Sequence, residues 1–196
     1  MATTYYERMP PMSASWARAL TRSRPGLADP AAMPRIEARL GGLAIDAAWV
    51  GRYNAITGMA NDVGLPITAP QHLAFPLHMA VLTAPAFPLR VLGVVHARQR
   101  IEQRRPVPID ARPSVGVFIE AARQARRGVE IDLVTEFDLE GETIWRGVTT
   151  MLALGAGTPI ADADSGALAE RSQQAEELPA DPEISAILRL APDLGR

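Results

Sequence analysis

The 196-residue chain contains no cysteine. This absence excludes disulfide bonds, thiolate nucleophiles and metal sites built on cysteine. Lysine is absent as well, so all twenty basic side chains are arginines, and the formal net charge is −2. No stretch approaches the roughly 20 apolar residues of a membrane-spanning helix, and the first residues lack a basic region followed by an apolar run, the order of a secretory signal. We therefore expect a cytoplasmic protein without a membrane span.

Histidine is scarce too, and the three imidazoles belong to His72, His78 and His96. Their spacing does not match a zinc-binding helix motif, so we expect no metal. We expect His72 to lie in a loop and His96 on the face of a strand.

The arginines gather in two clusters, at residues 98–105 and 123–127. Because the net charge is slightly negative and few aromatic residues lie between the arginines, a nucleic-acid-binding surface is not expected. Two interpretations remain. The clusters form a solvated face of β-strands, which we favour, or they contact the phosphates of a charged cofactor such as coenzyme A.

The composition, with 47% apolar and 21% charged residues, is that of an ordinary globular protein, and the length suits one domain. Residues 1–34 are rich in proline, serine and arginine and predict an N-terminal arm with one short helical segment, in SWARALTR. Residues 35–155 carry the periodic patterns of a folded domain. Residues 156–196 are predicted to be an acidic linker and a C-terminal tail, because most of this stretch is small, acidic and without periodicity.

Two stretches predict helices. The run that ends at Gly58 has apolar residues at helical spacing, and we expect its Tyr53 to lie in the core. In HLAFPLHMAVL, Leu77 and the four residues from Met79 to Leu82 are apolar nearly all round the helix. A helix without a polar face must be buried. Pro76 fits the first turn of that helix, where its missing N–H costs least.

The second half of the chain predicts antiparallel strands. Apolar residues alternate with acidic ones over residues 129–139, the sequence EGE at residues 140–142 supplies a turn, and a second apolar run follows. Such alternation is typical of a sheet with one solvated face. Together with the buried helix it predicts an α+β fold, in which an antiparallel β-sheet wraps around a central helix.

Several segments, in a fixed order, resemble one enzyme family: Tyr53 and ITG, then GLPIT, FPLHM, LGVVHARQRIEQRRPV and FDLEGETIWRGVTTML. This order resembles the MaoC-like acyl dehydratases, which include the (R)-specific enoyl-CoA hydratases. The similarity spans about residues 36–154 and is strongest to the N-terminal, degenerate hot-dog half of two-repeat members. It implies a hot-dog fold and the reversible addition of water across the 2,3 double bond of an enoyl thioester.

The resemblance also implies where the chemistry belongs. The family uses an aspartate and a histidine, spaced as in G-D-x-N-P-x-H, and both groups must reach one water molecule. When DVGLPIT is aligned with this motif, Pro66 matches the proline, Val63 takes the place of the aspartate and Thr68 that of the histidine. Asp62 lies one residue early, which in an extended stretch points its side chain to the other side. We therefore expect no acid–base pair at this motif. Asp62, Thr68 and His78 are the catalytic candidates, and a self-sufficient enzyme would use some combination of these and His72.

His78 lies just before the central helix in the family pattern, where a backbone N–H contacts the thioester oxygen. Two roles are open for it. It contacts the thioester or acts as a surrogate base, or it is a buried imidazole bonded to the backbone, which we favour. The resemblance makes Pro66, Phe75, His78 and Met79 the candidates for substrate binding. We expect no cofactor apart from the acyl-CoA or acyl-carrier-protein thioester that serves as substrate.

The leading hypothesis is an acyl-thioester-binding hot-dog subunit, or half, of an enoyl-CoA hydratase or dehydratase. Its partner is a second hot-dog domain, as a homodimer or as a catalytic heterodimer, because the chain ends at Arg196, where the second repeat begins in two-repeat relatives. The alternatives are a self-sufficient hot-dog hydratase or thioesterase with a rearranged site, and a non-enzymatic acyl-binding domain.

Overall fold

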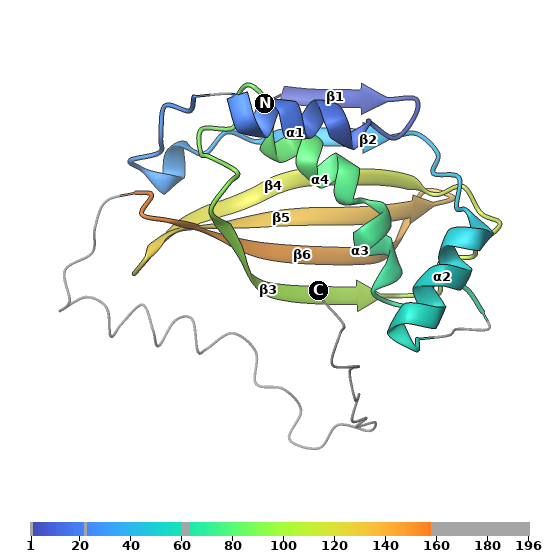
Figure 1. The fold of residues 1–196 in the computed structure, drawn as a ribbon. Helices are drawn as coiled ribbons and strands as arrows, with labels where there is room; N and C mark the ends of the chain where they lie inside the picture. Colours follow the sequence, from blue (N-terminus) through green and yellow to red (C-terminus); the bar gives the residue numbers. More distant parts are fainter. Residues whose placement is uncertain (1, 22, 60–62, 158–196) are drawn as a thin grey trace, which may run out of the picture. The chain divides into compact units, whose positions relative to one another are not determined.

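A computed structural model of the chain describes residues 2–21, 23–59 and 63–157. Its elements are shown in Figure 1. In chain order they are β1 (Ala2–Tyr6), α1 (Met12–Thr21), the 3-10 helix η1 (Pro30–Ala32), β2 (Ile36–Leu40), α2 (Ala47–Thr57), α3 (Ala69–Leu73), α4 (Phe75–Leu82), β3 (Val94–Gln103), β4 (Ser114–Ala125), β5 (Gly128–Leu139) and β6 (Glu142–Leu154).

The strands form one six-stranded sheet in the order β1-β2-β4-β5-β6-β3. All neighbours pair antiparallel except β1 and β2, which are parallel. The predicted turn between β5 and β6 is confirmed: Glu140 and Gly141 both have positive φ, 56° and 82°. Positive φ at both central residues is the type I′ geometry, whose twist matches that of the flanking strands.

Helix α4 lies across one face of this sheet, in contact with β2 and β4 (Figure 1). Every residue from Leu77 to Leu82 is buried. The sheet offers the alternating apolar residues of β5 to the core, and Ile131, Leu133 and Phe137 are fully buried. Both predictions, the buried helix and the period-2 strand, are confirmed. The fold is the predicted α+β hot-dog arrangement.

The helix ends follow their capping chemistry. Asp46 accepts a hydrogen bond from the N–H of Ala48 at 2.9 Å and starts α2. Gly58, with φ of 69°, ends that helix as predicted. Pro76 occupies the first turn of α4. At the other end of α4, the guanidinium of Arg24 donates to three backbone carbonyls, those of Thr83, Ala84 and Phe87, at 2.6 to 3.1 Å.

The N-terminal segment takes a larger part in the fold than an arm lying on the domain. Residues 2–6 form β1, an edge strand of the sheet, and α1 packs against α4. The helix predicted in SWARALTR is present, within Met12–Thr21. Strand β1 escaped prediction because its five residues are exposed or half-buried, so they have no period-2 apolar pattern. The division at residues 34 and 155 stays a prediction, and most of the predicted tail lies outside the described residues.

Candidate functional site

The loop that resembles the family motif is bonded to the connection between β3 and β4 and to strand β6. Leu65 is fully buried and donates its N–H to the carbonyl of Val107 at 2.9 Å. A side chain on Gly64 has no room, because a Cβ there lies 2.5 Å from that same carbonyl oxygen. At the far end of the loop, the indole N–H of Trp145 donates to the carbonyl of Ile67 at 2.8 Å. Residues 64–67 therefore place Thr68 at a fixed point beside the sheet.

Thr68 stands where the family has its histidine, and its hydroxyl is already engaged. Its Oγ1 lies 2.8 Å from the phenol oxygen of Tyr53 and donates to the sulfur of Met59 at 3.6 Å. Val63, at the aspartate position, is 69% exposed. Asp62 lies outside the described residues. A threonine and a valine at these two positions offer neither an acid nor a base of useful pKa.

His72 lies in helix α3, one turn after Thr68, so the prediction of a loop was wrong. Its Nδ1 is 3.2 Å from the carbonyl oxygen of Thr68 and 3.4 Å from the phenol oxygen of Tyr53. Tyr53 packs against the core, as expected, but its ring also stacks on Trp49 and its hydroxyl joins Thr68 and His72. The i, i+4 spacing of Thr68 and His72 was the one signal in the sequence for this cluster.

Whereas His72 is exposed, His78 is buried. It is 4% exposed, and its Nε2 lies 2.7 Å from the hydroxyl of Thr135 on β5. Burial lowers the pKa of His78 from 6.5 to about 3, and the nearby imidazoles of His72 and His96 add to this shift. A neutral imidazole bonded to a buried threonine fits the structural alternative, except that the partner is a side chain and not the backbone.

The four substrate-binding candidates do not share one surface. Phe75 is 46% exposed, whereas Pro66, His78 and Met79 are buried. Their roles toward a substrate stay predictions.

Polar side chains also fix α3 on the sheet. Gln71 donates from Nε2 to the hydroxyl of Thr149 at 2.7 Å, and Thr149 donates to Oε1 of Gln99 at 2.8 Å. Next to them, Gly147 leaves room for the ring of Trp145, because a Cβ there lies 2.5 Å from that ring. The side chains of Gln71, Thr149, Gln99 and Trp145 therefore lie between α3 and the sheet.

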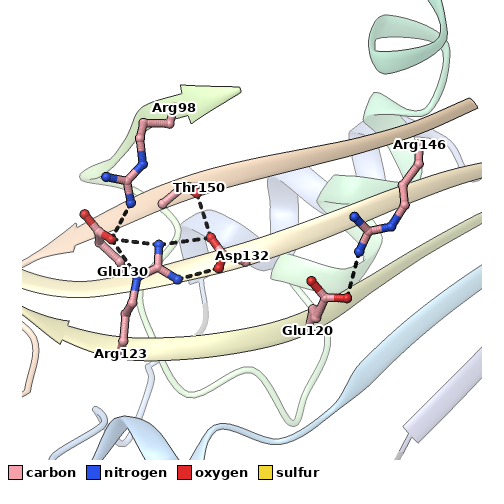
Figure 2. Close-up of polar contacts among 7 residues, drawn as sticks. All are labelled: Arg98, Glu120, Arg123, Glu130, Asp132, Arg146 and Thr150. Carbon is pink, nitrogen blue, oxygen red and sulfur yellow. Dashed lines mark hydrogen bonds and ion pairs between the residues drawn. The ribbon is translucent and has the colours of Figure 1, made fainter. Parts of the chain in front are cut away.

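Arginines of both clusters are paired on the other face of the sheet (Figure 2). Arg98 lies 2.7 Å from Glu130. Arg123 reaches both Glu130 and Asp132, and the bond to Asp132 is the main cause that raises its pKa. Two guanidiniums that already neutralise carboxylates are poorly placed to bind phosphates. This favours the solvated strand face for Arg98 and Arg123.

In the described part of the chain, no group of three or more histidine, aspartate and glutamate residues is arranged to hold a metal ion. None of the helices described there is long and apolar enough to cross a membrane.

The sequence and the structure of this chain are similar to those of known proteins. A curated protein of Mycobacterium tuberculosis, 3-hydroxyacyl-thioester dehydratase X, is 37% identical over 110 residues, which are 56% of this chain and 39% of that protein. Two crystal structures of HtdX from Mycobacterium tuberculosis match with TM-scores of 0.57 and 0.56, at 35% and 31% identity. The chain is a relative of these dehydratases. The predicted resemblance to MaoC-like acyl dehydratases is thus confirmed, although no family model matches the chain.

The relatives are considerably longer than the part that matches this chain. The two structural matches cover 60% and 77% of this chain but 51% and 57% of HtdX. The chain therefore spans about half the length, or less, of the relatives it matches.

Proposed function

We propose that the chain is an acyl-thioester-binding hot-dog subunit, or half, of a 3-hydroxyacyl-thioester dehydratase or enoyl-CoA hydratase, and that it acts in the cytoplasm. In this proposal a second hot-dog domain pairs with it and supplies the catalytic aspartate and histidine. The observation that carries the proposal is Thr68: it replaces the motif histidine, and its hydroxyl is bonded within the chain to Tyr53 and Met59.

The chemistry of water addition supports a role in substrate binding for this chain and a catalytic role for the partner domain. Water addition to an enoyl thioester needs a base for the water and an acid for the carbon next to the thioester. The motif positions 63 and 68 supply neither group, and the imidazole of His78 is buried and bonded to Thr135. The hot-dog sheet and helix α4 are present, and residues 64–67 are bonded to their neighbours, which supports a role in holding an acyl thioester.

The test is hydration of crotonyl-CoA, followed by the loss of the enoyl absorbance. The full chain alone is expected to hydrate crotonyl-CoA no faster than buffer. Addition of a separately produced hot-dog domain that carries the complete G-D-x-N-P-x-H motif, from the same genome, is expected to give turnover above that of the added domain alone. Rapid turnover by the chain alone contradicts the proposal.

A self-sufficient enzyme with a rearranged site is the second candidate, and one observation favours it. The imidazole of His72 lies one helical turn from Thr68 and contacts its carbonyl. If the chain alone hydrates crotonyl-CoA and His72→Ala abolishes this activity, the second candidate replaces the first.

A further inference from the structure

One stripe of the α3–α4 segment faces away from the core beside the motif loop. Thr68, His72 and Phe75 follow each other at the i, i+4, i+7 spacing that puts side chains on one helix face. The helical bonding continues across the junction of α3 and α4, because the N–H of Ala74 donates to the carbonyl of Pro70 at 3.0 Å. His72 is exposed, and Phe75 is 46% exposed. A polar and an apolar group are therefore presented together to solvent.

The contacts around His72 bear on which of its ring nitrogens carries the proton. Thr68 donates its hydroxyl proton to the sulfur of Met59, and its Oγ1 also lies 2.8 Å from the phenol oxygen of Tyr53. The phenol oxygen and the carbonyl oxygen of Thr68 lie 3.4 and 3.2 Å from Nδ1 of His72. Because the carbonyl can only accept, we assign the hydrogen to Nδ1. With this assignment Nε2 of the neutral imidazole carries the lone pair, and no described residue bonds to it.

An exposed imidazole with this tautomer is a hydrogen-bond acceptor for a ligand. The ligand class of the proposed function offers one donor that saturated acyl thioesters lack, the hydroxyl on carbon 3. A hydroxyl has one proton to donate and two lone pairs. When its proton points to Nε2 of His72, its lone pairs stay available to an acid on the partner domain, which must protonate this oxygen before it leaves as water.

We propose that His72 binds the 3-hydroxyl of a 3-hydroxyacyl thioester through Nε2. Tyr53 and Thr68 are positioning residues, because they hold the proton on Nδ1. Ile67 and Phe75, 43% and 46% exposed, lie five residues before and three residues after His72 in the chain and offer apolar surface to the acyl carbons. This assignment rests on the proposed function, and it names the group that separates substrate from other acyl thioesters.

The experiment compares two matched ligands on the full chain by titration calorimetry. (R)-3-hydroxybutyryl-CoA and butyryl-CoA share every group except the hydroxyl. The wild-type chain is expected to bind the hydroxyacyl ester about 2- to 10-fold more tightly, the range of one net hydrogen bond. In His72→Ala this ratio falls to about 1, while the affinity for butyryl-CoA is unchanged.

Two further variants separate the role of His72 from general effects. His96→Ala removes another exposed imidazole, on β3, and keeps the wild-type ratio. Tyr53→Phe keeps the ring beside Trp49 but removes one of the two acceptors of Nδ1, so an intermediate ratio is expected. Thermal unfolding of each variant reports whether the fold is retained.

The outcomes distinguish this inference from the proposed function. Equal binding of the two esters by the wild-type chain, or a ratio that survives in His72→Ala, overturns the role of His72 and leaves acyl-thioester binding intact. If neither ester binds, acyl-thioester binding by the chain fails, and the inference fails with it.

Discussion

At the scale of residues, two histidines six positions apart on one segment have opposite properties. His72 faces solvent with its Nε2 unbonded among the described residues, whereas Nε2 of His78 is buried against Thr135. The difference follows from the helix: six residues are about one and two-thirds turns, so the two side chains leave the helix in different directions. Burial lowers the pKa of His78, and this has a consequence for stability.

We predict that His78 makes the protein sensitive to acid. Its pKa is about 3 in the folded state against 6.5 ordinarily, so between these values the unfolded chain binds a proton that the folded chain does not. Proton uptake on unfolding means that stability is fully present above pH 6.5 and falls as the pH drops toward 3. The expected slope is at most about 1.4 kcal/mol per pH unit. Urea unfolding at several pH values from 7 to 4.5 measures it.

The control is a comparison of slopes and not of absolute stabilities. His78→Gln is less stable at pH 7, but it loses the part of the slope that comes from His78. The carboxylates are the same in the two proteins, so the difference between the two slopes reports His78. Identical slopes in the wild type and His78→Gln contradict the assignment.

The sequence alone predicted the content of the motif positions, but not their surroundings. Val63 and Thr68 follow from a direct alignment with the family pattern. The bond from Thr68 to Tyr53 does not, because it depends on how α2 packs beside the loop, and the two residues are fifteen positions apart. The partner of His78 was missed for the same reason: Thr135 lies 57 residues further along the chain.

At the scale of elements, the periodicity of apolar residues predicted those helices and strands whose burial is regular along the chain. Helix α4 and the hairpin of β5 and β6 were predicted because burial on all sides, or on alternate sides, leaves a clear sequence pattern. Strand β1 was not, since an exposed edge strand lacks such a pattern. The contacts of Arg24 at the end of α4 could not be predicted from the sequence either, because its partners in them are three backbone carbonyls, which have no side-chain signal in the sequence.

We predict that Arg24 stabilises the C-terminal end of α4. Its guanidinium donates to the carbonyls of Thr83, Ala84 and Phe87 just after the helix, and its positive charge interacts favourably with the negative end of the helix dipole. Arg24→Ala is expected to lower the free energy of unfolding by about 1–3 kcal/mol, measured by urea unfolding. Arg24→Lys recovers only part of this, because an ammonium lacks the planar fork.

A matched arginine serves as the control for Arg24. Arg52 on α2 is exposed, and its contact with Asp46 is 4.0 Å long. Arg52→Ala is expected to change the free energy of unfolding by less than about 0.5 kcal/mol. If both alanine variants lose the same stability, the carbonyl contacts of Arg24 do not contribute as proposed.

At the scale of the whole molecule, residues 1–159 form one compact unit, and all the described helices and strands lie within it. The sheet closes on α4 there, and both the motif loop and the cluster of Tyr53, Thr68 and His72 lie inside this unit. The valine and the threonine at motif positions 63 and 68 are therefore local changes on a hot-dog scaffold. This is the condition under which a hot-dog domain can keep ligand binding while catalysis is supplied by another domain.

We predict that a chain ending at Pro159 folds and binds like the full chain. All the hydrogen bonds and core contacts described for the sheet, α4 and the motif loop come from residues before this point. The truncated chain is expected to unfold within about 2 °C of the full chain in a thermal scan, since a loss of 1 kcal/mol shifts the midpoint of a domain of this size by about 2–4 °C. It is also expected to bind butyryl-CoA with the affinity of the full chain. A markedly lower midpoint means that residues 160–196 stabilise the domain, and lost binding with an unchanged midpoint means that they take part in holding the acyl thioester.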